Sequence, residues 1–207
     1  MKKKTIALLL VLMMVFGVSV GGTVAYLMDK ESVTNTFTIG NVKIDLTETI
    51  AEGKDAWSEK IIPGTTYGKD PLVTVTDSEP CYVFVKITEN ISFDAGKNGT
   101  FADYFDYDVR TAEWKELPGA AGIKGNEKVY WKAVDATTNP GTDIYVLTGD
   151  DKNTNGKITI NDTVTQEMID NLDGNPTLVI TAYAIQQANM NGEADAWAKL
   201  VVAYPAS

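Results

Sequence analysis

Short runs of alternating apolar and polar residues recur along most of this chain, and this alternation is the feature that most restricts its fold. A period of two places successive side chains on opposite faces of a β-strand. Most runs end at Gly, Pro, Asn or Asp, which favour turns. The predicted strands cover residues 35–46, 72–76, 82–88, 104–110, 128–136, 144–147, 157–160 and 177–186. The first run is broken at Gly40 and Asn41, which predicts one bent strand or a hairpin.

Three short segments depart from this pattern because they carry helix formers at helical spacing. They cover residues 28–33, 165–171 and 193–200, with acidic residues early in each. Strands without regular helices between them predict antiparallel pairing in two packed sheets. We therefore expect an all-β, antiparallel two-sheet sandwich, jelly-roll-like, with short helical connections.

The N-terminus has the three-part layout of a secretory signal peptide. Three lysines near the start precede an uncharged apolar stretch at residues 6–20, and a tripeptide of small residues follows at residues 23–25. This layout predicts a signal helix over residues 1–25, with cleavage between Ala25 and Tyr26. An uncleaved membrane anchor is the alternative, because about 20 apolar residues can span a bilayer. On the first interpretation the chain meets a membrane only during export.

The predicted mature chain, residues 26–207, has the length of a single domain and is strongly acidic. Without the three lysines of the signal peptide, 15 basic residues remain of the 18 in the whole chain, against 28 acidic ones, a net charge of −13. Repulsion from phosphate backbones argues against nucleic acid as a partner. The alternative reading of the acidity is that it only keeps an exported protein soluble.

The chain has one cysteine and no histidine, which removes most catalytic chemistry. Cys81 lies in a predicted strand, where a lone thiol more often packs as a small hydrophobic group than reacts. Without histidine, zinc motifs of the H-E-x-x-H type and Ser-His-Asp or Cys-His mechanisms are impossible. Composition does not exclude a pair of carboxylates that hydrolyses glycosides, but no motif favours one. We therefore expect no enzymatic activity.

Residues 151–162 follow the layout of a calcium-binding loop, with glycine at its sixth position. Four candidate oxygen ligands occupy the usual positions, Asp151, Asn153, Asn155 and Asp162. Two of them are neutral amides and the last is Asp rather than Glu, so weak Ca²⁺ binding is the most that the loop predicts. The alternative is a polar turn that leads into the strand at residues 157–160. No other cofactor is expected.

Two stretches beside the predicted cleavage site form a recognisable pattern. They are GGTVAYLMDKE at residues 21–31 and NTFTIGNV at residues 35–42. Looser matches follow, among them YVFVK at residues 82–86 and TAYAIQ at residues 181–186. These stretches resemble the TasA/CalY (camelysin) family, exported proteins of Gram-positive bacteria whose signal peptides are substrates of a SipW-type signal peptidase. Camelysin is classed as a metallopeptidase, but a chain without histidine cannot form the usual zinc site.

The resemblance implies a jelly-roll-like sandwich that is secreted to the biofilm matrix or cell surface, where TasA-type subunits polymerise into fibres. In such fibres the mature N-terminal segment adds a strand to a neighbouring subunit. Here that segment is residues 26–46, and four of its side chains are candidates for the contact, Phe37, Ile39, Val42 and Ile44. The implied partners are a SipW-type signal peptidase and other copies of the chain or related matrix proteins.

Two alternatives to this function stay open. The segment at residues 26–46 can equally be an internal part of its own domain, since a strand pattern does not say which chain it pairs with. The protein would then be a monomeric extracellular binding module, with or without calcium, for a cell-wall or host ligand. An extracellular hydrolase is the third and weakest reading.

Overall fold

The computed structural model describes residues 28–32, 35–38, 42–48, 60–76, 79–135, 142–150 and 155–205. The predicted signal helix and its cleavage site at Ala25 and Tyr26 lie outside the described residues. Ile39, Asp151 and Asn153 lie outside them as well.

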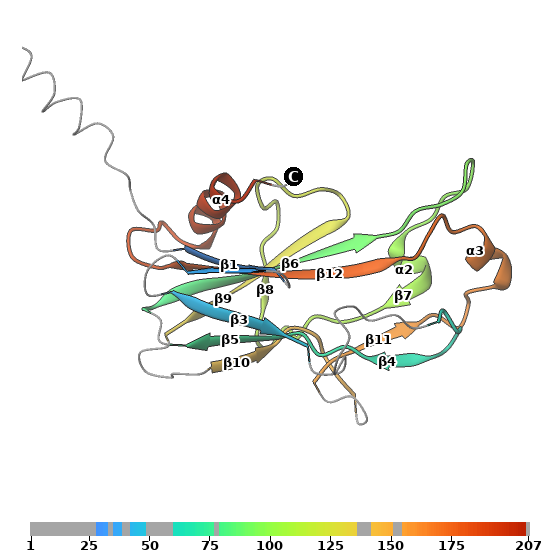
Figure 1. Ribbon diagram of the computed structural model, residues 1–207, viewed down its shortest axis with the longest axis horizontal. Coiled ribbons are helices and arrows are strands. Elements are labelled where there is room, and N and C mark those ends of the chain that lie inside the picture. Colours follow the sequence, from blue (N-terminus) through green and yellow to red (C-terminus); the bar gives the residue numbers. More distant parts are fainter. Residues whose placement is uncertain are drawn as a thin grey trace, which may run out of the picture.

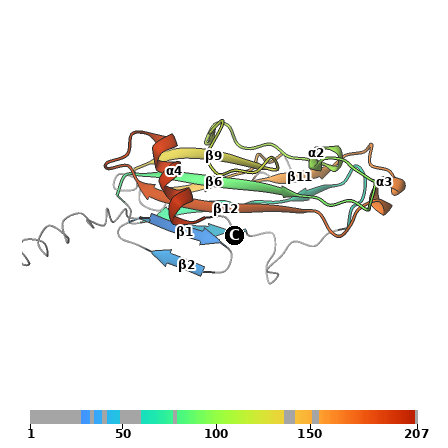
Figure 2. The same ribbon diagram turned by 90° about the horizontal axis from the view of Figure 1, so that it is seen from above.

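The largest sheet has six strands in the order β2-β1-β12-β6-β9-β8 (Figure 1). Its strands are β1 (Met28–Ser32), β2 (Asn35–Thr38), β6 (Cys81–Asn90), β8 (Lys115–Glu116), β9 (Glu127–Val134) and β12 (Thr177–Gln186). The two longest, β6 and β12, pair along their full length of 10 residues. This pair forms the long axis of the molecule (Figures 1 and 2).

Two sheets of three strands lie below this axis in Figure 1, one near each end. One has the order β10-β5-β3 and the other the order β4-β11-β7. Their strands are β3 (Lys43–Thr47), β4 (Thr66–Gly68), β5 (Leu72–Thr76), β7 (Phe105–Asp106), β10 (Thr142–Tyr145) and β11 (Lys157–Ile160). The strand pairs are antiparallel, so the predicted all-β, antiparallel class is confirmed. The described strands form three sheets, however, and not the two that we expected.

In the described part of the chain, three helices connect or cover the strands: α2 (Phe101–Tyr104), α3 (Gln166–Asp170) and α4 (Glu193–Ala203). The last two confirm the helices predicted near these positions. Helix α3 begins after Thr165, whose hydroxyl accepts a hydrogen bond of 3.3 Å from the amide of Met168. Helix α4 lies across one face of the large sheet (Figures 1 and 2).

Alternation along β6 supplies two separate cores. Cys81, Val83, Val85 and Ile87 are buried together with residues of β3 and β5, between the large sheet and the β10-β5-β3 sheet. Phe84 belongs to a second cluster with residues of α4 on the opposite face. A third cluster joins α2, β7 and β11. Burial raises the pKa of the Cys81 thiol to about 12, so the thiol stays protonated and packs as a small apolar group.

Two local predictions near the N-terminus need correction. Residues 28–32 form strand β1 instead of a helix, because pairing with β12 outweighs the helix propensity of Met, Lys and Glu. Of the two alternatives for residues 35–46, the hairpin is wrong, since β2 pairs with β1 while β3 pairs with β5 in a different sheet. The alternative of one bent strand turns on residues 39–41, which lie outside the described residues.

A third local prediction is only partly right. Within residues 104–110, Tyr104 ends a helix and β7 has only 2 residues. Further along, Val109 forms an isolated bridge with Leu147. The sequence patterns also missed the short strands β4 and β8.

Candidate functional site

The predicted assembly segment begins as a hairpin at one edge of the large sheet (Figure 2). Strand β1 pairs with β12, from Met28 opposite Ile185 to Glu31 opposite Ala182. Strand β2 pairs with the other side of β1 and is the outermost strand. An outermost strand presents backbone groups along its outer side that another strand can bind. Among the described strands, the hairpin therefore forms one end of this sheet and joins it through the pairing of β1 with β12.

The remainder of the predicted assembly segment lies inside the domain. Val42 and Ile44 are 0% and 1% exposed, and Ile44 in β3 lies opposite Val75 in β5. Phe37 is placed on the peripheral strand β2. The segment thus divides into an edge hairpin, residues 28–38, and a core strand, residues 43–47, so Val42 and Ile44 serve the domain's own core.

The structure describes two of the four predicted calcium ligands. Asn155 precedes β11 and Asp162 follows it. The strand β11 lies between them along the chain. Calcium binding by this loop and the alternative of a turn leading into a strand both stay predictions. Among the described residues, no three His, Cys, Asp or Glu side chains gather in a possible metal site.

The glycine at the sixth position of the predicted loop has a different physical role. Gly156 accepts a hydrogen bond of 3.1 Å from the amide of Lys69. A Cβ atom at position 156 would lie 2.0 Å from the carbonyl oxygen of Lys69, which is far inside van der Waals contact. Close approach of two backbone segments therefore requires glycine here.

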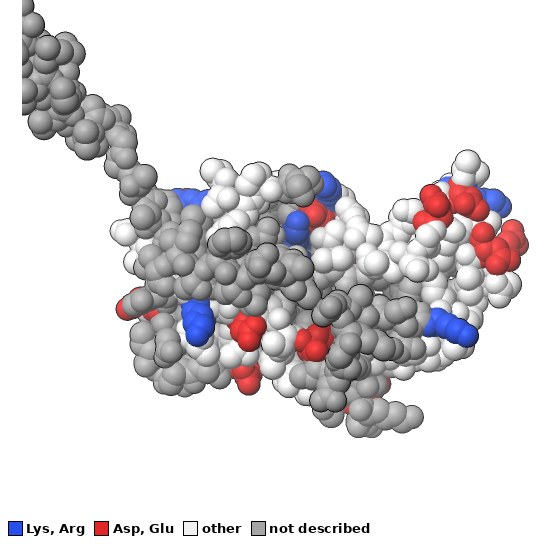
Figure 3. Space-filling view, in the orientation of Figure 1, with Lys and Arg blue, Asp and Glu red and all other residues white. Residues whose placement is uncertain are grey.

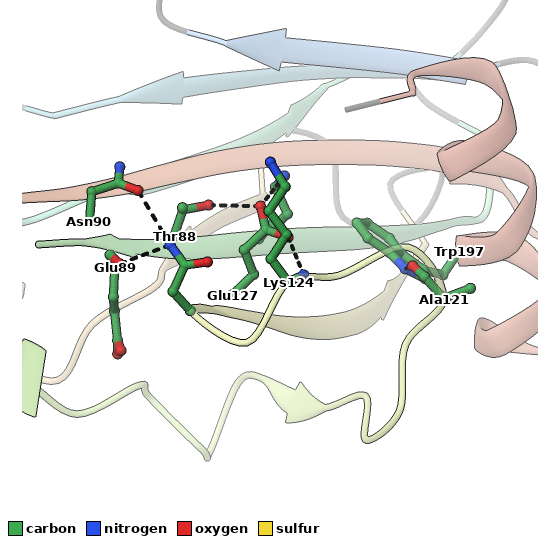
Figure 4. A network of polar contacts seen from close by, with 9 residues as sticks. Thr88, Glu89, Asn90, Ala121, Lys124, Glu127 and Trp197 are labelled. Carbon is green, nitrogen blue, oxygen red and sulfur yellow. Dashed lines mark hydrogen bonds and ion pairs between the residues drawn. The ribbon is translucent and has the colours of Figure 1, made fainter. Parts of the chain in front are cut away.

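A buried charge cluster centres on Glu127, which is 7% exposed (Figure 4). One carboxylate oxygen accepts hydrogen bonds from Lys86 Nζ at 2.9 Å and Thr88 Oγ1 at 3.5 Å. The other accepts the backbone amide of Lys124 at 2.7 Å. The cluster fixes the loop before β9 to the face of β6. Glu127 and Lys86 are 41 positions apart, so no local pattern in the sequence indicates this contact.

These contacts hold the pKa of Glu127 below its usual value of 4.5. Burial alone would raise the pKa, but the Lys124 amide and the Lys86 ammonium outweigh burial by stabilising the carboxylate. Because the folded-state pKa is lowered, the carboxylate stabilises the fold above pH 4.5, and this contribution is lost as the pH falls through the lowered pKa.

We therefore predict a reduced acid sensitivity in Glu127→Gln. At pH 7 the variant should lose about 2 kcal/mol of unfolding free energy, because an amide cannot accept these hydrogen bonds in the same way. As the pH falls through the lowered pKa of Glu127, the unfolding free energy of the variant should approach that of the unchanged protein. Urea unfolding at a series of pH values measures both quantities, with the exposed Glu79→Gln as control. An equal pH dependence in the two variants would contradict the prediction.

No family model, curated protein or solved structure matches this chain. Within the described residues, no helix has both the length and the apolar character to cross a membrane. We therefore base the functional proposal mainly on the edge hairpin and the sheet that it extends.

Proposed function

We propose that this chain is an exported structural protein whose copies assemble into an extracellular fibre or surface layer by β-strand addition. The observation that carries the proposal is the hairpin of β1 and β2, which extends an otherwise self-contained sheet at β12. The proposal includes the resemblance to the TasA/CalY family. It also includes removal of a signal peptide between Ala25 and Tyr26 by a SipW-type peptidase during secretion by a Gram-positive bacterium.

Assembly requires the hairpin of one copy to leave its own β12 and to pair with β12 of another copy. The same backbone hydrogen bonds form in both cases, so the exchange replaces each broken bond with an equivalent one. Its equilibrium then depends on protein concentration and on any new contacts between subunits. Because each copy donates one hairpin and accepts one, exchange in one direction is head-to-tail, and it propagates into an open filament when its rotation does not close into a ring.

The jelly-roll-like topology belongs to this proposal. The first described strand, β1, lies beside the last, β12, and several consecutive strands, such as β5 and β6, belong to different sheets. Both features are typical of Greek-key sandwiches. In such a topology the N-terminal strand lies at the periphery of one sheet, where it can be exchanged without rearranging the strands between.

A reversible disulfide between β1 and β12 tests the exchange directly. Glu31 and Ala182 are opposite each other in the antiparallel ladder, where Cα atoms are typically about 4.5–5.5 Å apart, within the range that a disulfide spans. We predict that the oxidised double variant Glu31→Cys with Ala182→Cys stays monomeric, and that it forms fibres after reduction. Electron microscopy and size-exclusion chromatography measure the outcome.

The single variant Ala182→Cys is the matched control. It carries the same substitution at the buried position 182, but it cannot form the cross-link to position 31. The native Cys81 is buried and should not interfere. Fibre formation by the oxidised double variant would exclude exchange of the hairpin. If the unchanged exported chain stays monomeric at every concentration, the monomeric binding module becomes the better reading.

A further inference from the structure

We infer that the end of the molecule opposite the edge hairpin carries a binding site for a neutral saccharide. A depression of about 510 Å³ lies there between the loop at residues 96–99, helix α2, the turn after β11 and helix α3. This volume falls in the range of about 300–1,000 Å³ typical of small-molecule sites. The hairpin and α3 lie toward opposite ends of the large sheet (Figures 1 and 2). The inference is therefore independent of the proposed assembly.

The walls of this pocket are fixed by hydrogen bonds between segments that are distant in the sequence. Asn161 donates from its side chain to the carbonyl of Ala102 at 2.9 Å, and its backbone amide donates to the carbonyl of Tyr104 at 2.9 Å. The Tyr104 hydroxyl donates to the carbonyl of Met168 at 2.9 Å. These bonds join α2, the turn after β11 and α3, so the pocket is formed before any ligand binds.

Several polar groups that line the pocket remain available to a ligand. In the described part of the chain, the side chains of Asn98, Thr163 and Asn171 make no hydrogen bond. A primary amide offers a donor and an acceptor in one plane, and a hydroxyl offers both from one atom. Adjacent hydroxyl groups of a sugar ring present the same combination. The side chains of Met168 and Ala102 add apolar surface for the carbon face of the ring.

Charge around the pocket argues against an anionic ligand. Figure 3 shows acidic side chains gathered at the end of the molecule that carries α3. Asp103 lines the pocket, and one of its oxygens already accepts the amide and hydroxyl of Thr100 at 2.7 and 2.9 Å. Lys97 is the one basic residue of the lining. A phosphate or uronate would therefore be repelled, whereas a neutral ring with several hydroxyl groups meets matching donors and acceptors.

Saturation-transfer difference NMR of the exported chain tests the inference, with the trisaccharide of N-acetylglucosamine and with cellotriose as probes. We expect at least one probe to bind with a dissociation constant of about 1 mM. The double variant Asn98→Ala with Asn171→Ala should raise this constant at least about tenfold, since two hydrogen bonds are lost. Neither side chain bonds to the rest of the protein, so the fold should be unchanged.

Asn175→Ala is the matched control, because it removes an exposed amide that does not line the pocket. It should bind as the unchanged chain does. Absence of saturation transfer to both trisaccharides at about 10 mM would overturn the inference. Equal binding by the double variant and the control would overturn it as well, because the sugar would then lie elsewhere. Loss of fibres in the disulfide experiment would leave sugar binding unaffected.

Discussion

A chain that lacks residues 26–38 should stay a soluble monomer at concentrations at which the complete exported chain forms fibres. The deletion removes β1 and β2, the two strands that the proposed assembly transfers between subunits. Strand β12 keeps β6 as its antiparallel partner along its full length. The buried residues of the three core clusters lie between Val42 and Leu200, so the truncated chain keeps all of them and should still fold. Electron microscopy and far-ultraviolet circular dichroism measure assembly and folding separately.

Two proline substitutions, one in β1 and one in β8, test the same hypothesis as this deletion. Lys30 lies in the middle of β1, opposite Tyr183 on one side and Phe37 on the other. Lys30→Pro removes a backbone donor there, so we expect it to slow fibre growth. Glu116→Pro makes the same change in β8 at the opposite edge and should have little effect. A truncated chain that still forms fibres would exclude strand donation by this hairpin, and one that does not fold would make the hairpin an integral part of the domain.

Replacing Trp197 by alanine should have the largest effect of any single substitution on the attachment of α4. Its side chain is 3% exposed, and its ring lies 5.4 Å from that of Phe84 and 5.5 Å from that of Tyr183. Its indole N–H donates to the carbonyl of Ala121 at 2.9 Å, so one residue joins the helix, the sheet and a loop (Figure 4). Loss of this packing should lower the unfolding free energy by about 3–5 kcal/mol.

Urea unfolding followed by far-ultraviolet circular dichroism measures this change in the monomeric protein. Val202→Ala is the control on the same helix, because Val202 is 82% exposed and should contribute little. A loss of less than about 1 kcal/mol in Trp197→Ala would mean that α4 is not docked on the sheet in solution.

Local alternation was sufficient to predict the most regular strands of this fold. The predicted runs at residues 72–76, 157–160 and 177–186 coincide with β5, β11 and β12. Each of these strands is paired with a neighbour on both sides. The apolar and polar residues along each strand therefore indicate which side chains face the core. The helix prediction for residues 28–33 failed because the partner that makes them a strand, β12, lies at the other end of the chain.

The candidate sites were less predictable, because long-range pairing creates them. Nothing in the sequence near residues 35–46 indicates that β2 and β3 join different sheets. The polar pocket gathers Asn98, Asn161 and Asn171 from three separate segments, and no local pattern indicates that the three meet. One local signal was available: Thr100 and Asp103 have the spacing of a capping box and mark the start of α2.

The adjacency of β1 and β12 also governs the order in which the chain can fold. Among the described strands, β1 is synthesised first and β12 last. Strand β1 therefore cannot pair with β12 until the C-terminal part of the chain has been made. Contacts this distant in the sequence are slow to form, because the intervening loop must first be closed. During this interval the N-terminal strands of one chain and the completed sheets of older copies coexist at the same place. The topology therefore gives kinetic preference to pairing between chains wherever many copies emerge together.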